Sequence, residues 1–336
     1  NPTVANDIVY MSSNNRLSAF SLTTGAPVGI VSGSPEMSSG DNRGNTTVAF
    51  VRGLPSGPDR DVVVVSGGTF PSISVWETNL ETSGPTPIWG ATPGVGSTIP
   101  GGLLAQTRFN TAKVVDVAGA DVLFVLTEPS TGSGHLWAIS AGSGALYPGW
   151  ATNPLVLDAA GKHGPAVSGG KLYVGTAIGG SNVSGSLYQS DAATGAVDWN
   201  FVGVAGEGWP SGVSTEGAFL YGATKDAGNV GYRYKIDKSG ALPSVVWTAA
   251  QGTGLYGTPT IGRGFVYFPL DNPSFGLLQV KKDLGLVSRN FAASDDICGN
   301  TLFMVTQIVT LSCDSYIFAG DRNARWWLLN AVTGAY

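Results

Sequence analysis

A short unit of strand, turn and strand recurs along this chain and constrains the fold more than any other feature of the sequence. In each copy, two apolar runs are followed by a turn of small residues that ends in glycine. The clearest copy reads Lys171-Leu-Tyr-Val-Gly-Thr176, then Ser186-Leu-Tyr-Gln-Ser-Asp191, then Ala-Ala-Thr-Gly195. A single unit of this kind cannot bury both faces of its sheet, so successive units must stack against one another.

Glycines mark these units at intervals of 45 to 60 residues. Apolar and polar residues alternate between the markers, a period that predicts short strands. A glycine after the third strand can adopt positive φ in a tight hairpin leading to the fourth strand, which a residue with a Cβ would resist. The seven markers are Gly25, Gly84, Gly144, Gly195, Gly240, Gly285 and Gly334.

These features predict an all-β protein, a seven-bladed β-propeller of four-stranded antiparallel blades, with six or eight blades as alternatives. We expect one domain over residues 1–336. Its blades would span about 1–29, 43–92, 107–151, 160–202, 207–249, 254–292 and 304–336. The last blade would lack its outermost strand unless another segment or chain supplies one. Aromatic residues near the fourth strands are expected to wedge between blades, namely Trp89, Trp150, Trp199 and Trp247.

The segment from Lys171 to Trp199 closely resembles the repeat of PQQ-like propellers, and Leu17 to Gly25 and Trp326 to Gly334 resemble it next. Quinoprotein dehydrogenases with such repeats are longer and carry a vicinal disulfide over the quinone and a calcium site of acidic and amide side chains. Here the two cysteines lie 15 residues apart, and the sequence has no such acidic cluster. The resemblance therefore implies the repeat architecture, and we expect no bound PQQ.

One acidic loop, Asp116 to Asp121, is faintly similar to the calcium loops of integrin-like propellers. It lacks the alternating carboxylates that would supply six or seven oxygen ligands. We interpret it as a tight turn between the first two strands of a blade, with a calcium site as the weaker alternative. No other metal site is expected.

The charge composition narrows the choice of partners and compartment. Charged residues make up only 12% of the chain, and the net charge is -5. With no basic cluster, the chain is not expected to bind nucleic acid. Its longest apolar runs are too short for a transmembrane segment. The chain begins at Asn1-Pro2 without an initiator Met, as it would after removal of a secretion signal or after trimming of the chain. We expect a secreted, extracellular or cell-surface protein, with the periplasm as an alternative.

Two kinds of covalent modification would fit that compartment. The only cysteines, Cys298 and Cys313, are expected to form one disulfide, the alternative being two buried thiols. N-glycosylation sequons begin at Asn45 and Asn182, and the second lies in a Gly/Ser-rich loop.

Residues that open the first strand of successive blades suggest a ligand-binding face. In propellers of this connectivity, those positions lie around one mouth of the central channel, where they place Phe109, His163, Trp209 and Tyr256 in four consecutive blades, with Arg325 nearby. Aromatic and imidazole rings at a concave mouth suit a sugar or another flat ligand. The alternative is that these rings only pack against neighbouring loops.

Four residues on the same face could take part in catalysis. His135 and His163 map to adjacent blades, and with Tyr256 and Arg322 they could supply acid, base and charge-stabilising groups, as in propeller-shaped polysaccharide lyases. No spacing demands this role, and the sequence has no GxSxG, HExxH, Walker or EF-hand motif.

The leading hypothesis is an extracellular, non-catalytic binding or scaffold propeller that recognises a glycan, a small molecule or a protein. One alternative is an enzyme, either a polysaccharide lyase, a hydrolase or a degenerate quinoprotein oxidoreductase. The other is a structural module of a larger extracellular assembly.

Overall fold

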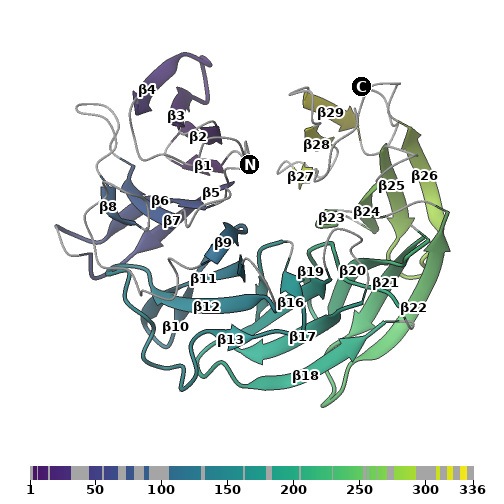
Figure 1. The fold of residues 1–336 in the computed structure, drawn as a ribbon. Coiled ribbons are helices and arrows are strands. Elements are labelled where there is room, and N and C mark those ends of the chain that lie inside the picture. Colours follow the sequence, from purple (N-terminus) through teal and green to yellow (C-terminus); the bar gives the residue numbers. More distant parts are fainter. Residues whose placement is uncertain are drawn as a thin grey trace. The chain divides into compact units, whose positions relative to one another are not determined.

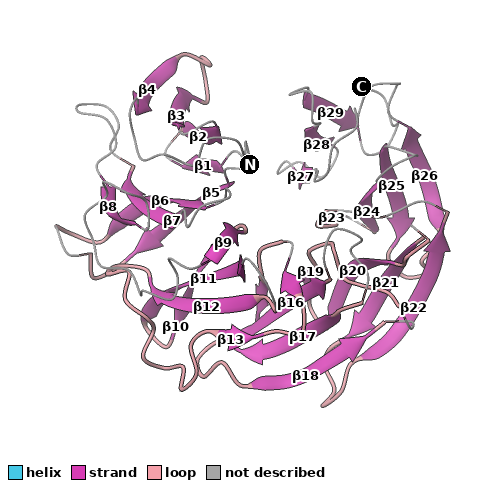
Figure 2. Ribbon diagram, viewed as in Figure 1, coloured by secondary structure: helices cyan, strands magenta, loops and turns pink. Residues whose placement is uncertain are grey.

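The computed structural model contains only β-strands, turns and loops in the part of the chain that it describes (Figure 1, Figure 2). That part comprises residues 3–5, 7–13, 16–31, 45–54, 57–66, 73–78, 87–90, 106–129, 133–161, 163–178, 184–203, 206–228, 230–252, 255, 257–262, 264–270, 276–292, 308–310, 316–320 and 326–330. The strands form seven sheets, six of which have at least four strands. The predicted all-β class and four-stranded antiparallel repeat are confirmed. Each sheet is called a blade below, numbered in chain order.

The chain divides into two compact units, of which the first comprises residues 1–165 with 191–196. This unit holds blades one to three, with strand orders β1-β2-β3-β4, β5-β6-β7-β8 and β10-β11-β12-β13, and β9 pairs with β11. The strands are β1 Thr3–Ala5, β2 Ile8–Ser13, β3 Arg16–Ser21, β4 Pro27–Val31, β5 Asn45–Val51, β6 Arg60–Ser66, β7 Ile73–Glu77, β8 Pro87–Gly90, β9 Gln106–Phe109, β10 Lys113–Val117, β11 Ala120–Pro129, β12 His135–Ser140, β13 Leu155–Val156 and β14 Ala160–Gly161.

The second unit comprises residues 166–190 with 197–336. It holds the strands of four blades, in the orders β16-β17-β18 with β15 beside β16, β19-β20-β21-β22, β23-β24-β25-β26 and β27-β28-β29. The strands are β15 Ala166–Ser168, β16 Lys171–Ala177, β17 Ser186–Asp191, β18 Val197–Val202, β19 Ser214–Glu216, β20 Phe219–Lys225, β21 Gly231–Asp237, β22 Ser244–Gln251, β23 Thr260–Gly262, β24 Phe265–Leu270, β25 Gly276–Lys281, β26 Val287–Ala292, β27 Ile308–Thr310, β28 Tyr316–Gly320 and β29 Trp326–Asn330.

The turn between the third and fourth strands has the predicted glycine conformation in four blades. Gly25, Gly144, Gly195 and Gly285 have φ values between 67° and 75°, and each N–H donates to the carbonyl four residues earlier. In blade four, Asp191 fixes the turn, because its Oδ1 accepts from the N–H groups of Ala193 and Thr194. Short polar side chains that bond to nearby backbone in this way favour tight turns.

A β-bulge recurs in the fourth strand of five blades and was not predicted from the sequence. In each, the register with the third strand shifts by one residue shortly after the turn. A bulge leaves one residue unpaired and redirects the next side chain. In blades two, four and five that next residue is Trp89, Trp199 and Trp247; in blades one and six it is Gly29 and Arg289.

Tryptophans from three blades pack between blades, as predicted, and each docks on the glycine turn of the next blade. The indole Nε1 of Trp89 donates to the carbonyl of Ala141 at 2.7 Å, and Trp150 donates to Ala192 at 2.9 Å. In the second unit, Trp247 donates to Lys282 at 2.8 Å. The ring also covers the turn glycine, where an added Cβ would lie 2.7–2.9 Å from an indole carbon. The repeated glycine thus provides both the turn conformation and the space for the indole.

The turn of blade five departs from the predicted pattern. Gly240 does not have positive φ, because six residues, 238–243, connect β21 to β22 and no tight hairpin forms. The prediction for this marker glycine was wrong. Correspondingly, Trp199 of blade four is 4% exposed, but its Nε1 has no hydrogen-bond acceptor in the described structure.

Apolar side chains fill the spaces between neighbouring sheets. In the first unit, Trp89 packs in one cluster with Val64 of blade two and Ile139 of blade three. In the second unit, Trp199 and Tyr234 belong to one cluster of blades four and five. The core is therefore divided among the blade junctions, as stacked repeats require.

The contact of Trp150 with Gly195 can be tested by adding one methyl group. Gly195→Ala places a Cβ on a residue with positive φ and also against the indole of Trp150. Gly25→Ala places a Cβ on a residue with a similar positive φ, but no atom lies within 4 Å of that Cβ. We expect Gly25→Ala to cost roughly 1–2 kcal/mol and Gly195→Ala to cost about 1–3 kcal/mol more, measured by chemical denaturation. Equal losses would show that Trp150 does not press on this turn.

Candidate functional site

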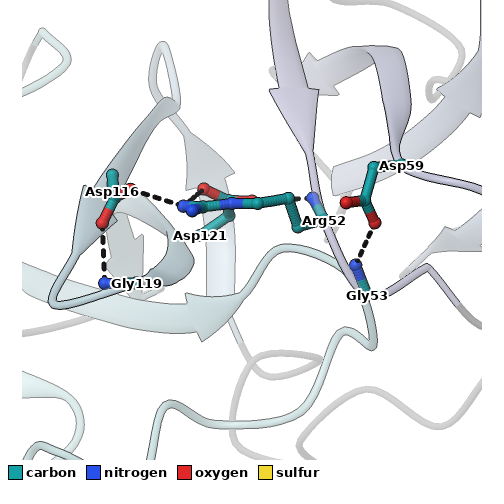
Figure 3. Close-up of polar contacts among 6 residues, drawn as sticks. All are labelled: Arg52, Gly53, Asp59, Asp116, Gly119 and Asp121. Atoms are coloured by element: carbon teal, nitrogen blue, oxygen red, sulfur yellow. Dashed lines mark hydrogen bonds and ion pairs between the residues drawn. The ribbon is translucent and has the colours of Figure 1, made fainter.

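A cluster of three charged side chains lies at the junction of blades two and three (Figure 3). Arg52, just after β5, donates from Nε and Nη2 to the two oxygens of Asp121 at 3.0 and 2.7 Å. Its backbone N–H also donates to Asp121, and Nη2 bonds to Asp116 at 2.5 Å. Figure 3 shows the guanidinium extending between the two carboxylates. The pairing with Asp121 is bidentate, the stronger geometry for an arginine and a carboxylate.

These contacts shift the pKa values of both acids in the same direction. The side-chain bonds from Arg52 are the main cause of the lowered pKa of Asp121. For Asp116, the main cause of the lowered pKa is a hydrogen bond from the backbone N–H of Gly119, followed by the bond from Arg52. The two carboxylates in turn raise the pKa of the guanidinium. Arg52, Asp116 and Asp121 therefore stay charged over a wide pH range and connect blades two and three. This set of contacts is called the charged tie below.

The predicted tight turn in the Asp116–Asp121 loop is confirmed, with Ala118 and Gly119 at positive φ between β10 and β11. A calcium ion here would have to displace the guanidinium from both carboxylates. Within the described ranges, no group of three or more His, Cys, Asp or Glu side chains is placed to hold a metal ion. The loop thus holds an arginine of the preceding blade.

A buried carboxylate that the sequence did not single out lies in the second unit. Glu207 is 1% exposed, and its Oε2 accepts hydrogen bonds from Thr224 Oγ1 at 2.7 Å and Tyr234 Oη at 2.8 Å. The backbone of the next residue, Gly208, exchanges two hydrogen bonds with Lys225. Glu207 thereby ties the loop between β18 and β19 to blade five. Because the Glu207 carboxylate is buried, a ligand in solvent does not reach it, and we assign Glu207 the role of holding this loop in position.

Trp209 was predicted to offer its ring to a ligand, and the structure places it in the core instead. The residue is 0% exposed, and its ring lies 5.2 Å from Tyr234 and 5.9 Å from Phe201 between ring centroids. Its backbone N–H donates to the carbonyl of Thr176. A ring enclosed on both faces by protein cannot stack on a sugar, so the packing alternative describes this residue.

The two histidines lie in different surroundings within the first unit. His135 begins β12, is half-buried, and lies edge-on to Trp137 with 6.2 Å between ring centroids. Burial lowers the pKa of its imidazole. His163 follows β14 and is 7% exposed. The next residue, Gly164, faces the carbonyl of Thr111 so closely that a Cβ would not fit.

The other predicted residues cannot be placed as side chains. The backbone of Phe109 ends β9 and that of Asn45 begins β5, but their side chains are outside the description. Tyr256, Arg322, Arg325, Cys298, Cys313 and Asn182 lie outside the described residues altogether. Convergence of the four catalytic candidates, the disulfide and glycosylation therefore remain predictions.

The four polar residues of these two contacts carried only weak signals in the sequence. Arg52 directly follows an apolar strand, and Asp116 and Asp121 had drawn attention as a loop, but nothing in their spacing indicated that they meet. Glu207 stands alone in the glycine-rich segment Val204-Ala-Gly-Glu-Gly208. An isolated acid in such a loop is usually solvated, so its burial follows only from the tertiary structure.

Solved structures with similar folds decide the architecture. The yeast protein Sqt1 from Saccharomyces cerevisiae, a WD40 propeller, matches at a TM-score of 0.62 with 8% identity, covering 97% of this chain and 81% of Sqt1. The fold is a β-propeller. The computationally designed Ika8 protein matches at a TM-score of 0.54 with 11% identity, covering 98% of this chain and 95% of that one.

BamB from Moraxella catarrhalis matches less well, at a TM-score of 0.46 with 16% identity, over 80% of this chain and 68% of BamB. A scan against models of protein families finds no match, and a sequence search of curated proteins finds none either. These likenesses concern the fold alone. The structure also holds no helix, among the residues it describes, that is long and apolar enough to cross a membrane.

The charged tie predicts unequal effects of two amide substitutions. Asp121 is the more buried acid, with a side chain 7% exposed against 57% for Asp116, and it accepts three of the four hydrogen bonds from Arg52. We expect Asp121→Asn to lower the melting temperature clearly and Asp116→Asn to lower it only slightly.

The contacts of Arg52 with Asp116 and Asp121 also predict that the stability of the fold depends on pH. Because both acids have lowered pKa values in the folded state, the stability from this tie is fully present above the unfolded value, about 4, and is lost as the pH falls through the folded value. The difference in melting temperature between wild type and Asp121→Asn should therefore shrink below about pH 4. A difference that stays constant with pH would rule out the tie.

Proposed function

We propose that this chain is a non-catalytic binding or scaffold propeller with PQQ-like repeats. The proposal rests on one observation in particular: the charged side chains described above make contacts that hold the blades together. Arg52, Asp116 and Asp121 join two blades, and Glu207 ties a connecting loop to blade five. Side chains that could otherwise take part in chemistry stabilise the frame, and the loops carried by a rigid frame are then available for recognition.

The proposed binding surface consists of the loops that enter the first strand of each blade. Phe109, Tyr256 and Arg325 are its proposed contact residues, whereas His163 and Trp209, which were predicted for the same face, are buried at 7% and 0% exposure. A protein, a glycan or a small molecule would bind through aromatic stacking and the charge of the arginine. That propellers commonly serve as binding platforms is an argument from fold, and it supports a partner of any of these classes.

An enzyme is the second candidate, and it has one observation in its favour. Burial lowers the pKa of His135, which favours the neutral imidazole, the form that a general base requires. In this alternative, His163, Tyr256 and Arg322 would complete the site. The expected reaction is proton abstraction next to a uronate carboxyl, and His135→Ala would abolish it.

Location outside the cytoplasm is part of the proposal. The low charge content, the sequons at Asn45 and Asn182, and the pair Cys298 and Cys313 support it. Mass spectrometry of the natively expressed protein without reductant tests two of these features together. We expect a mass two hydrogens below that of the reduced chain after glycan removal.

The binding surface can be tested with two aromatic substitutions. The wild type is screened on a glycan array and, in parallel, in a proximity-labelling experiment that detects protein partners. Tyr256→Ala should abolish retention of the ligand found, whereas Trp209→Phe should leave it intact and only lower the melting temperature, because Trp209 is buried. If Tyr256→Ala retains the ligand, the proposed surface is wrong.

A further inference from the structure

The outermost strand of blade five, β22, differs from the other described outer strands because it is long and carries neither a charged residue nor a proline. It is the longest of them, with eight residues, Ser-Val-Val-Trp-Thr-Ala-Ala-Gln, and none is charged. Among the described residues, β22 pairs only with β21, so its other edge presents unpaired backbone N–H and C=O groups. An exposed, uncharged edge of this kind is a template for another strand.

The other outer strands of blades one to six each show a device that discourages pairing. The strands β4 and β8 have five and four residues and begin with Pro27 and Pro87, and β13 has only two residues. Arg289 lies exposed in β26, and β18 carries Asp198, whose carboxylate pairs with Lys171 at 2.9 Å. Charge, proline and shortness are the usual means of blocking edge-to-edge association. Their common absence from β22 marks this edge as available.

The exposed side chains of β22 suit an added strand. Val246, the unpaired residue of the bulge, is exposed, and beyond the bulge Thr248 and Ala250 are exposed while Trp247 and Ala249 are half-buried. Small residues on an exposed face leave room for larger side chains on a neighbouring strand. The stretch from Trp247 to Gln251 is regular and spans about 16 Å, enough for five residues of a partner.

An apolar border lies next to this edge in the second unit. Trp247 docks on Gly285, which lies between Leu284 at 62% and Leu286 at 59% exposure. Val246, next to Trp247 in the chain, is 47% exposed. A strand added to β22 would therefore approach apolar side chains from two blades, and covering them removes apolar surface from water.

We propose that the edge of β22 binds an extended, uncharged segment of a partner polypeptide by strand addition. Main-chain hydrogen bonds would supply the pairing, and apolar side chains of the segment would cover the leucines beside Gly285 on the face to which Trp247 points and Val246 on the other face. A charged segment is disfavoured, since β22 offers no opposite charge to a group that loses water. This inference rests on the proposed binding role and names a protein partner for it, at a surface other than the loops.

A defined peptide tests the proposal directly. The probe is a fluorescein-labelled Thr-Val-Thr-Val-Thr-Val-Thr peptide with blocked ends, and binding to the full chain is followed by fluorescence anisotropy. Thr248→Lys places a charge on the exposed face of β22 and should weaken binding about tenfold, equivalent to ~1.4 kcal/mol. The matched control is Asn290→Lys, because Asn290 occupies the same place after the bulge of β26. It should bind as the wild type does.

Hydrogen exchange of the wild type with and without the peptide should show added protection in residues 244–251 and not in residues 287–292. The proposal is overturned if the peptide does not bind, or if both lysine variants bind as the wild type does. It is also overturned if sedimentation shows a dimer that Thr248→Lys dissociates, since the edge would then take a second copy of this chain. Tyr256→Ala should leave peptide binding unchanged, so failure here is distinguishable from failure of the proposed loop surface.

Discussion

The docking of a tryptophan on the turn of the next blade is the interaction on which the rest of this structure depends. A four-stranded blade has two apolar faces and cannot bury both alone. The indole solves this locally, because it fills the space above a glycine while its N–H satisfies a turn carbonyl, as Trp150 does at Gly195 and Ala192. Burial and hydrogen bonding thus coincide in one side chain, and each blade is positioned by its neighbour.

Much of this frame could be predicted from the sequence because its determinants are local. A Thr-Gly or Ser-Gly turn and alternating apolar residues leave a periodic record, and the tryptophans that follow the turns were recognisable as wedges. The bulge that aims Trp89 and Trp247 left no such record, because any residue can occupy it. Gly240 shows the opposite error: the motif is present, but a longer connection removes the need for positive φ.

The candidate site was less predictable, for a physical reason. Arg52 meets Asp121 across 69 residues of sequence, and no local pattern encodes a contact at that separation. Trp209 illustrates a second difficulty: at the entry to a blade, the same aromatic residue can face a ligand or fill the core. Only the neighbouring rings, here Tyr234 and Phe201, decide which. A polar or aromatic residue at a blade junction is therefore evidence first of how the blades pack, and only second of a binding or catalytic role.

The recurring bulge has a consequence for how such a chain can change. At the joints made by Trp89 and Trp247, one unpaired residue of the bulge sets the direction of the docking side chain, so these two joints are specified by the bulge, the indole and a glycine. Trp150 makes the same contact with its glycine turn without a bulge before it. Joints of this kind place few demands on the length of a blade's loops or on the composition of its outer strand. In a propeller built with such joints, the outer strand and loops of a blade can change in sequence while its contact with the next blade is kept.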